Sequence, residues 1–373
     1  MNPASTAHPG PVIVGLSGGV DSAVAALLLV EQGYEVQGLF MSNWDDADQY
    51  CTQAEDFQDA RAVARVLGIP LHRANFAADY RGRVFEHFLA ELRAGRTPNP
   101  DVLCNREVKF GVALRHALRL GARYFATGHY ARLRHVDDDV QLLKAVDAVK
   151  DQSYFLHAVQ RADLRHALMP VGEYTKAQVR ARARTAGLPV YAKPDSTGIC
   201  FIGERPFREF LRQYIDETPG PIESATGQRL GTHCGLPFYT LGQRGGLGLG
   251  GRSDSETTPW YVAAKDASRN VLIAVQGHDH PLLCARELQC SDLRWLVAPP
   301  TAALRCTVRV RHRHTDQPAV LHPGTDGTAR VLFDEPQRAL TPGQFAVAYD
   351  GDLCLGGGTI SEVTSAATRH AAA

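Results

Sequence analysis

Several features that would assign the protein to a class at once are missing from its 373 residues. No apolar run reaches the roughly 20 residues that a membrane-spanning helix needs, so no membrane partner is expected. Lys and Arg together number 40, and so do Asp and Glu, so any nucleic-acid partner must be met by a local basic surface. Residues 1–10 lack the apolar segment of a secretory signal; we expect a disordered lead and a cytoplasmic protein.

The eight cysteines include no C-x-x-C pair and match no common zinc spacing, so no metal centre is predicted. Most of them are expected to be small core residues in a reducing compartment. The hydrophobic content of 44% and the charged content of 21% are those of an ordinary globular protein. At roughly 100–200 residues per domain, the chain is long enough for two or three domains.

Strands and helices alternate over residues 11–130, which predicts an α/β domain with a doubly wound parallel sheet. Short alternating runs separated by Pro and Gly follow Cys284 and predict a C-terminal β-barrel. The expected division is a lead at 1–10, a nucleotide-binding domain at 11–215, a small β-rich domain at 216–284, a barrel at 285–363 and a disordered tail at 364–373.

The most informative segment is the run Gly15-Leu16-Ser17-Gly18-Gly19-Val20-Asp21-Ser22. It lies between an apolar run that indicates a buried strand and a strong helix-forming stretch. Glycines let a phosphate approach the backbone, and the N–H groups of a helix start point at it. No Lys follows the glycines, so the segment is not a Walker loop. The pattern S-G-G-x-D-S resembles the pyrophosphate loop of the N-type ATP pyrophosphatases, which transfer AMP to a carbonyl or carboxyl oxygen.

Ligands of doubly wound sheets lie beyond the carboxyl ends of the strands. Met41 and Gly128 fall at two other strand ends, so they are expected near the loop of residues 15–22. The resemblance implies that all eight loop residues, Met41 and Gly128 contact ATP. From spacing alone, Met41 is nearly as well explained as a core residue at a strand end.

Cys104 and Cys200 differ from the other cysteines because each lies in a predicted loop beside polar or basic groups. The two prolines of residues 97–105 disfavour helix and central strand around Cys104. A helix is expected from about Arg106, and its dipole, with Arg106 and Lys109, would lower the pKa of the Cys104 thiol. The spacing alone leaves open whether the two cysteines form a functional pair.

Taken together, several segments resemble the bacterial tRNA-specific 2-thiouridylases, in order, from about residue 11 to residue 360: GLSGGVDS, LFMSNWDD, GRTPNPDVLCN, ATGHYA, LLKAVDAVKDQSYFL, STGICFIG and LGQRGGLGLGG. The resemblance implies ATP-dependent 2-thiolation of the wobble uridine of tRNA, position 34. AMP is transferred to the uracil C2 oxygen with release of pyrophosphate, and sulfur delivered as a cysteine persulfide then replaces that oxygen and releases AMP.

The same resemblance implies a role for several loop residues. Cys200 carries the persulfide and Cys104 is the nucleophile, and a Cys104–Cys200 disulfide forms in the cycle. Either Cys104 releases hydrosulfide from the persulfide or the persulfide attacks directly, and a reductant then restores both thiols. Asn99, Pro100 and Asp101 contact the target base, with Asp101 as a candidate acid or base. Without the resemblance, turn chemistry explains Asn99 and Asp101 better.

Contacts with tRNA are implied at Lys150, Asp151 and Gln152 and at Arg311 and His312. Arg309, Arg311 and Arg313 alternate, so in a strand they would project from one face toward RNA phosphates. A surface turn is the alternative for residues 150–152, and a charged edge strand is the alternative for the arginines.

The expected co-substrates are ATP with Mg²⁺ and persulfide sulfur from a cysteine desulfurase or a sulfur-relay protein. The resemblance implies tRNAs for Lys, Glu and Gln as substrates, and we expect a monomer. There are two alternative functions. One is an amidotransferase-type ligase, such as an NAD or GMP synthetase, and the other is a nucleotide-binding redox sensor with a regulatory Cys104–Cys200 disulfide. Pyrophosphate release that depends on unmodified tRNA distinguishes all three.

Overall fold

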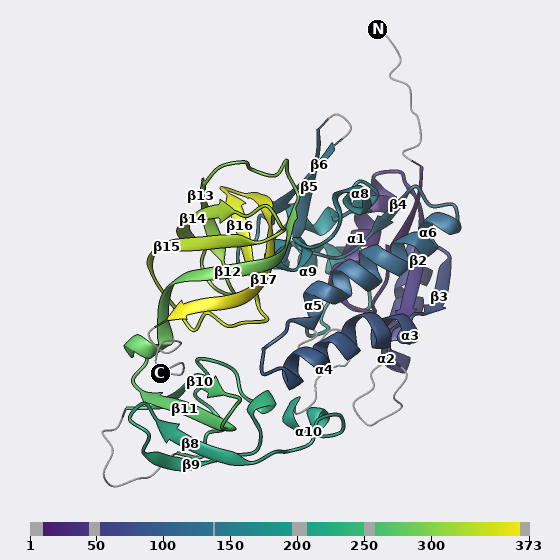
Figure 1. Cartoon of the computed structure of the whole chain (residues 1–373). Helices are drawn as coiled ribbons and strands as arrows, with labels where there is room; N and C mark the ends of the chain where they lie inside the picture. Colours follow the sequence, from purple (N-terminus) through teal and green to yellow (C-terminus); the bar gives the residue numbers. More distant parts are fainter. Residues whose placement is uncertain (1–9, 45–52, 137–138, 196–206, 250–257, 366–373) are drawn as a thin grey trace. The chain divides into compact units, whose positions relative to one another are not determined.

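A computed structural model of the chain describes residues 10–44, 53–136, 139–195, 207–249 and 258–365 (Figure 1). Contacts divide the chain into two compact units, and each unit draws on separate stretches of sequence. The first comprises Met1–Phe85, Pro100–Arg205 and Asp352–Leu355, and the second comprises Glu86–Asn99, Pro206–Gly351 and Gly356–Ala373. Residues 86–99 therefore pack with the C-terminal half of the sequence.

The first unit contains a five-stranded sheet in the order β3-β2-β1-β4-β7, and all its pairings are parallel. Its strands are β1 (Pro11–Gly15), β2 (Glu35–Ser42), β3 (Leu71–Asn75), β4 (Tyr124–Ala126) and β7 (Ala167–Leu168). The strand order reverses between β1 and β4, which is where open α/β sheets bind ligands. The predicted doubly wound parallel sheet is confirmed.

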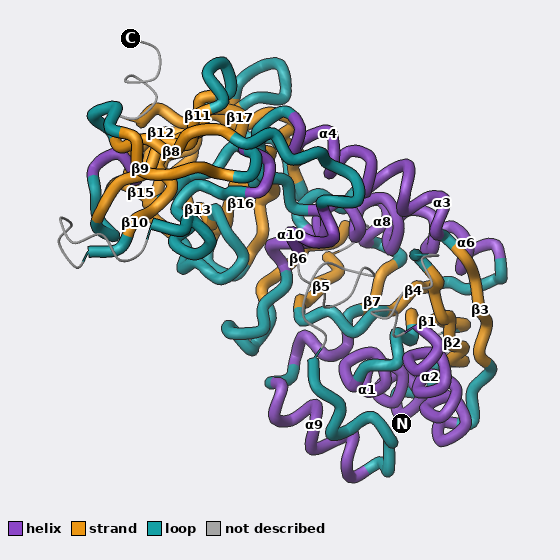
Figure 2. Tube along the Cα trace, turned by 90° about the horizontal axis from the view of Figure 1, so that it is seen from below, coloured by secondary structure: helices purple, strands orange, loops and turns teal. Residues whose placement is uncertain are grey.

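Helices cover both faces of this sheet: α1, α2 and α9 lie on one side and α3, α6 and α8 on the other (Figure 2). Helix α1 (Val20–Glu31) is rich in Ala, Val and Leu, and these residues are buried, so it packs as a core element. Other helices of the unit are α2 (Gln53–Leu67), α3 (Ala77–Tyr80), α7 (Ser153–Leu156), α8 (Arg161–Leu164), the 3₁₀ helix η3 (Pro170–Glu173) and α9 (Lys176–Thr185).

Two helical stretches contain π-helical turns, which interrupt α-helices and are frequent at functional sites. In one, η1 (Arg81–Phe85) joins α3 to α4 (Glu86–Arg93). In the other, α5 (Pro100–Leu103), η2 (Cys104–Ala113) and α6 (Leu114–Arg119) follow one another without a break. The expectation that residues 97–105 stay out of helix was therefore wrong: Pro100 is the first residue of α5, and a helix accepts proline at that position.

An antiparallel hairpin completes the first unit. Strands β5 (Ala131–Val136) and β6 (Asp139–Lys144) pair antiparallel, and Leu143 of β6 pairs with Leu353.

The second unit contains a small sheet and a closed barrel. The sheet has the order β10-β11-β8-β9, from β8 (Gly220–Ser224), β9 (Arg229–His233), β10 (Trp260–Asp266) and β11 (Val271–Gln276). The barrel has the order β12-β15-β14-β13-β16-β17 and closes through the β12–β17 pairing. Its strands are β12 (Cys284–Trp295), β13 (Leu304–Arg309), β14 (Gln317–Pro323), β15 (Ala329–Arg338), β16 (Phe345–Asp350) and β17 (Leu353–Ser365).

The predicted C-terminal barrel is confirmed. Besides α4, the helices of this unit are α10 (Phe207–Leu211) and the 3₁₀ helices η4 (Leu236–Phe238) and η5 (Pro281–Leu283). Across the stretches that the structure describes, no helix combines the length and apolar character needed to cross a membrane.

Candidate active site

The glycine-rich loop connects β1 to α1, as predicted. The first intrahelical hydrogen bond runs from the Ala23 N–H to the Gly19 carbonyl at 3.2 Å, so the N–H groups of Val20, Asp21 and Ser22 lie ahead of it at the helix start. The Ser22 hydroxyl donates to the Gly19 carbonyl at 3.0 Å and accepts from the Ser17 N–H at 3.2 Å. These bonds fix the shape of a loop whose backbone donors suit an anion.

Three strand ends meet at this loop. A Cβ on Gly128, which follows β4, would lie 2.6 Å from the Ser22 nitrogen and 2.7 Å from the Asp21 carbonyl carbon, so only glycine fits there. A Cβ on Gly15 would lie 3.4 Å from Cε of Met41. Met41 and Gly128 are thus brought to the loop of residues 15–22, where β1 and β4 mark the reversal of the strand order.

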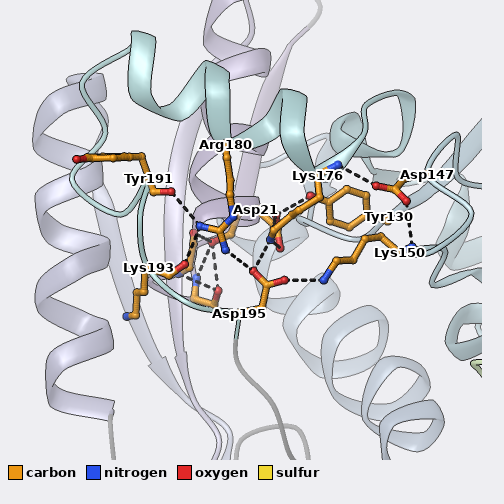
Figure 3. Close-up of polar contacts among 12 residues, drawn as sticks. Asp21, Tyr130, Asp147, Lys150, Lys176, Arg180, Tyr191, Lys193 and Asp195 are labelled. Atoms are coloured by element: carbon orange, nitrogen blue, oxygen red, sulfur yellow. Dashed lines mark hydrogen bonds and ion pairs between the residues drawn. The ribbon is translucent and has the colours of Figure 1, made fainter.

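Asp21 is the acidic residue of the loop, and two side chains from elsewhere in the unit bind it (Figure 3). Lys176 Nζ lies 2.7 Å and 2.8 Å from its two carboxylate oxygens, and the Tyr130 hydroxyl donates to it at 2.7 Å. Burial, and then the Asp21 charge, raises the pKa of Tyr130, so the phenol stays protonated as a donor. The carboxylate of Asp21 is therefore held in one orientation at the start of α1.

Lys176 also binds a second carboxylate, Asp195, at 2.6 Å (Figure 3). Lys150 and Arg180 reach the same carboxylate at 2.6 Å and 2.8 Å. Burial raises the pKa of Asp195, but hydrogen bonds from Lys150 and Lys176 outweigh it and lower the pKa to about 2. Lys176 thus connects Asp21 of the loop to a carboxylate that collects three cations.

The position of Lys176 is unusual for a cation. It is the first residue of α9, after the Thr175 cap, where the helix dipole disfavours positive charge. Two carboxylates offset that cost, and the side chain is only 13% exposed. Asp147 accepts a hydrogen bond from the Lys176 N–H at 2.9 Å and so supplies an anionic partner to the helix start.

Lys193 links the loop to helix α2. Its Nζ donates to the Gly18 carbonyl at 3.2 Å and to Asp56 and Asp59 at 2.7 Å and 2.5 Å. Burial lowers the pKa of Lys193, but the hydrogen bonds that it donates to both aspartates outweigh burial and raise the pKa. Gly18 has φ +80°, and a Cβ there would lie 2.4 Å from the Asp56 carbonyl oxygen. The loop and the start of α2 are therefore packed backbone to backbone.

Residues 150–152, which were predicted to contact tRNA, occupy different environments. Lys150 is part-exposed and binds Asp195. Asp151 is 3% exposed and accepts hydrogen bonds from the Ala145 N–H and the Ser153 hydroxyl. The side-chain oxygen of Gln152 accepts a hydrogen bond from the Tyr130 N–H at 2.9 Å. In this arrangement Asp151 and Gln152 stabilise the turn that presents Lys150.

Cys104 is fully buried at the first residue of η2 and is not in the expected loop ahead of a helix. The basic residues expected beside it make other contacts: Arg106 binds Glu107 at 2.7 Å, and Lys109 Nζ lies 3.4 Å from His129 Nε2. Burial, and then the Lys109 charge, lowers the pKa of His129 well below its usual value. Cys200 lies outside the described residues.

The three predicted base-contacting residues lie at the start of this helical stretch. Pro100 begins α5, Asn99 directly precedes it, and Asp101 lies in its first turn. Next to Cys104, Asn105 is 2% exposed and donates to the Phe155 carbonyl at 3.2 Å. Its side-chain oxygen has no hydrogen-bond partner in the part of the chain that the structure describes.

The predicted row of arginines along one strand face is wrong. Strand β13 ends at Arg309, so Arg311 and Arg313 belong to the turn that follows. Arg309 is 9% exposed, binds Asp316 at 2.6 Å, and lies over the Tyr349 ring. The turn replaces the strand because residues 310–314 precede β14 and must reverse the chain.

Arg311 and His312 are partly buried in this turn. One terminal nitrogen of Arg311 lies 3.1 Å from the Leu241 carbonyl, 3.0 Å from the Ala339 carbonyl and 2.9 Å from the Thr341 hydroxyl. The guanidinium therefore joins three segments of the second unit.

Comparisons with known proteins identify the family. A family described as the tRNA methyl transferase HUP domain matches residues 10–204, its PRC-barrel domain matches 208–276, and an aminomethyltransferase β-barrel domain matches 285–360. The tRNA-specific 2-thiouridylase MnmA of Chromohalobacter salexigens is 57% identical over 352 residues, which are 94% of this chain and 92% of the relative. The chain belongs to the tRNA-specific 2-thiouridylase family.

A second 2-thiouridylase, from Alkalilimnicola ehrlichii, is also 57% identical, over 95% of this chain and 98% of the relative. Among solved structures, a 4-thiouridine synthetase in complex with RNA and bound ATP has 18% identity and a TM-score of 0.34, covering 55% of this chain and 50% of that one. The 2-thiouridylase described here is a tRNA uridine sulfurtransferase that thiolates uridine in tRNA.

Sequence reasoning missed the polar and charged residues that surround the loop, namely Tyr130, Lys176, Lys193 and Asp195. Asp195 is more than 170 residues from Asp21 in sequence, and their link through Lys176 exists only after folding. The one local signal was Lys176 itself, a cation directly after a helix cap, which implies an anionic partner.

Proposed function

We propose that this sulfurtransferase activates the C2 oxygen of uridine 34 with AMP from ATP and then replaces that oxygen with sulfur. The observation that carries the proposal is the meeting of Asp21, Gly128 and Met41 at the helix start where β1 and β4 diverge. A uracil oxygen is a poor leaving group, whereas an AMP ester is a good one, so thiolation requires such activation.

The residues of the loop suit the phosphates of ATP. The N–H groups at the start of α1 lie where they can donate to phosphate oxygens, and the helix dipole adds to that attraction. They are fixed before the nucleotide arrives, so little reorganisation accompanies charge development in the transition state. Met41, packed against Gly15, offers an apolar surface for adenine.

Asp21 is the loop residue suited to Mg²⁺, which proteins bind through one or two carboxylates while substrate phosphates supply other ligands. No cluster of three or more acidic, His or Cys side chains suited to a metal occurs within the described ranges, so the donor set fits an ion that arrives with ATP. When bound, Mg²⁺ would neutralise phosphate charge. Lys176 and Tyr130 fix the Asp21 carboxylate in one place.

Sulfur transfer is assigned to Cys104 and Cys200. Cys200 accepts sulfur as a persulfide from a cysteine desulfurase or a relay protein. In one route, the Cys104 thiolate attacks the sulfur bonded to Cβ of Cys200, expels hydrosulfide, and forms a Cys104–Cys200 disulfide; the hydrosulfide then attacks C2, and AMP leaves with the C2 oxygen. In the other, the terminal persulfide sulfur attacks C2, AMP leaves with the C2 oxygen, and Cys104 then cleaves the sulfur–sulfur bond with formation of the same disulfide. In both routes, an external dithiol then reduces the Cys104–Cys200 disulfide.

Recognition of tRNA is assigned to Asn99, Pro100 and Asp101 at the base, to Lys150, Asp151 and Gln152, and to Arg311 and His312. Lys150 is presented by a turn that Asp151 and Gln152 stabilise. The substrates are tRNAs for Lys, Glu and Gln, and the enzyme acts as a monomer.

The experiment that tests the proposal measures pyrophosphate and 2-thiouridine with purified enzyme, ATP, a persulfide donor and unmodified tRNA. We expect pyrophosphate only when tRNA is present, and we expect Asp21→Asn to lower its release by at least about 100-fold. Cys200→Ser is expected to retain pyrophosphate release and lose 2-thiouridine. Thiolation by Cys200→Ser, or pyrophosphate release without tRNA at the same rate, would contradict the proposal.

A further inference from the structure

Residues 95–99 connect α4 to α5. They end with Asn99 and are followed directly by the helical stretch that contains Asp101 and Cys104. In the sequence, these residues lie within the predicted nucleotide-binding domain of residues 11–215. By contact they belong to the second unit, which also contains the barrel and the small sheet. The chain therefore packs with the second unit immediately before the residues assigned to base contact and sulfur transfer.

Three hydrogen bonds hold this segment within the second unit. Lys265 Nζ, from β10, donates to the Gly95 carbonyl at 3.0 Å. The Thr97 N–H donates to the Pro342 carbonyl at 2.9 Å, and Gln344 Nε2 donates to the Thr97 carbonyl at 2.7 Å. Both backbone groups of Thr97 are thus paired with one turn of the barrel, that of residues 339–344.

Sterics support the same arrangement. Gly343 has φ +91°, and a Cβ there would lie 2.9 Å from the Thr97 nitrogen and 3.0 Å from the Thr97 carbonyl carbon. Any side chain at this position would push against the backbone of the segment. The Lys265 amine beside the Gly95 carbonyl is largely buried, and burial lowers its pKa to about 8.

The turn of residues 339–344 also contacts Arg311. The guanidinium donates to the Ala339 carbonyl and the Thr341 hydroxyl, at 3.0 Å and 2.9 Å. Ala339 has φ +52°, a backbone conformation that costs energy for a residue other than glycine and persists where surrounding contacts impose it. One short turn therefore contacts a residue assigned to tRNA binding and the segment that leads to Cys104.

We infer that the turn of residues 339–344 positions the segment of residues 95–99, and that Gln344 is the positioning side chain through which barrel contacts fix the start of α5. The inference rests on the proposed function in assigning Asn99, Asp101 and Cys104 to the reaction. Gln344 contacts neither substrate; it acts by fixing the Thr97 carbonyl. The expected consequence is a lower rate of thiolation with unchanged affinity for tRNA and ATP.

The test compares wild type with Gln344→Leu, which keeps similar volume and removes the donor. Single-turnover thiolation at saturating ATP and tRNA is expected to fall by about 10- to 100-fold, since small displacements of reacting groups have effects of that size. The Kd for tRNA and the Tm should stay the same. Gln344→Lys, whose ammonium can donate to the Thr97 carbonyl, should restore most of the rate.

Gln337→Leu is the matched control. Gln337 is a barrel glutamine that donates to the Glu335 carbonyl at 2.9 Å, and its removal should leave thiolation unchanged. An unaltered rate in Gln344→Leu, or a loss that Gln344→Lys fails to restore, would overturn the inference.

Hydrogen exchange separates this inference from the proposed function, because it needs no catalysis. The Thr97 amide should exchange faster in Gln344→Leu than in wild type, while amides of β1 and α1 should not change. Equal exchange at Thr97 in the two proteins would overturn the inference even if the enzyme thiolates tRNA. Faster exchange in an enzyme that makes no 2-thiouridine would support it and contradict the proposed function.

Discussion

The edge of the parallel sheet and the C-terminal barrel use charged side chains in different ways. At the sheet edge, Lys176 binds two carboxylates, and one of these, Asp21, is part of the loop assigned to ATP. In the barrel, Arg309 is paired with Asp316, and Arg311 binds backbone oxygens of the second unit. The first region presents ionic groups where a charged ligand is expected, whereas the second uses them to fix its own turns.

The contrast between Lys176 and the barrel arginines shows that a basic residue in the sequence is not by itself a contact for RNA. The alternating arginines of residues 309–313 suggested a strand face open to phosphates, yet Arg309 is buried against Asp316. Lys176 was not among the predicted site residues, yet it binds both oxygens of the loop carboxylate. Mutations in the two regions should therefore separate catalysis from stability.

The largest effect is expected from Lys176→Met, which removes the cation between Asp21 and Asp195. Asp21 would lose its fixed orientation, so tRNA-dependent pyrophosphate release should fall by about 100-fold. The measurement is the rate of pyrophosphate release at saturating ATP, with circular dichroism to check the fold.

Arg182→Met is the control for this variant. Arg182 lies on the same helix, α9, and pairs with Glu31 at 3.0 Å on the surface, with 40% and 50% of the two side chains exposed. Its loss should leave pyrophosphate release unchanged. A Lys176→Met enzyme that is as active as Arg182→Met would remove the distinction between the sheet edge and the barrel.

An intermediate effect is expected from Arg309→Met in the barrel, and it should be on stability. The Arg309 and Asp316 side chains are 10% and 15% exposed, so the variant leaves a carboxylate buried without its partner. The free energy of unfolding should fall by about 3 kcal/mol, as measured by denaturant titration of the full chain. Pyrophosphate release should be unchanged under conditions in which the variant is folded.

Arg305→Met sharpens this prediction. Arg305 pairs with Asp334, but the side chains are 60% and 42% exposed, and such pairs contribute about 0–1 kcal/mol. If Arg309→Met were no less stable than Arg305→Met, the buried Arg309–Asp316 pair would not stabilise the barrel more than an exposed pair does.

The smallest effect is expected in the pH dependence of stability. The pKa of Asp195 is about 2, below the value in an unfolded chain, so its stabilising contribution is present above about pH 4 and is lost as pH falls toward 2. Asp195→Asn should be less stable than wild type at pH 7, and the difference in Tm should narrow between pH 5 and 3. A constant difference over that range would contradict the assigned ion pairs.

Patterns within short stretches predicted most of the fold. The loop of residues 15–22, the parallel sheet predicted from residues 11–130 and the C-terminal barrel follow from local turn, strand and helix preferences, and the structure contains them all. The start of α5 was missed because the prolines of residues 97–105 were taken as helix breakers, although Pro100 opens the helix.

The candidate site was predictable only in part. Met41 and Gly128 could be placed because parallel strands end at one edge of the sheet. The partners of Asp21 could not, because Tyr130 and Lys176 are more than 100 residues away in sequence; packing of α9 against α1 brings Lys176 to Asp21, and the segment between β4 and β5 brings Tyr130. The attachment of residues 95–99 to the second unit was likewise invisible, since its hydrogen bonds go to backbone carbonyls and amides that any sequence supplies.

The most direct test of the account follows one oxygen atom. tRNA with ¹⁸O at C2 of uridine 34 is incubated with the enzyme, ATP and a persulfide donor, and the AMP and pyrophosphate are analysed by mass spectrometry. If the C2 oxygen attacks the α-phosphate, one ¹⁸O enters AMP for each 2-thiouridine formed and none enters pyrophosphate. Thiolation with ¹⁸O in water or in pyrophosphate, and none in AMP, would contradict adenylation at the loop of residues 15–22.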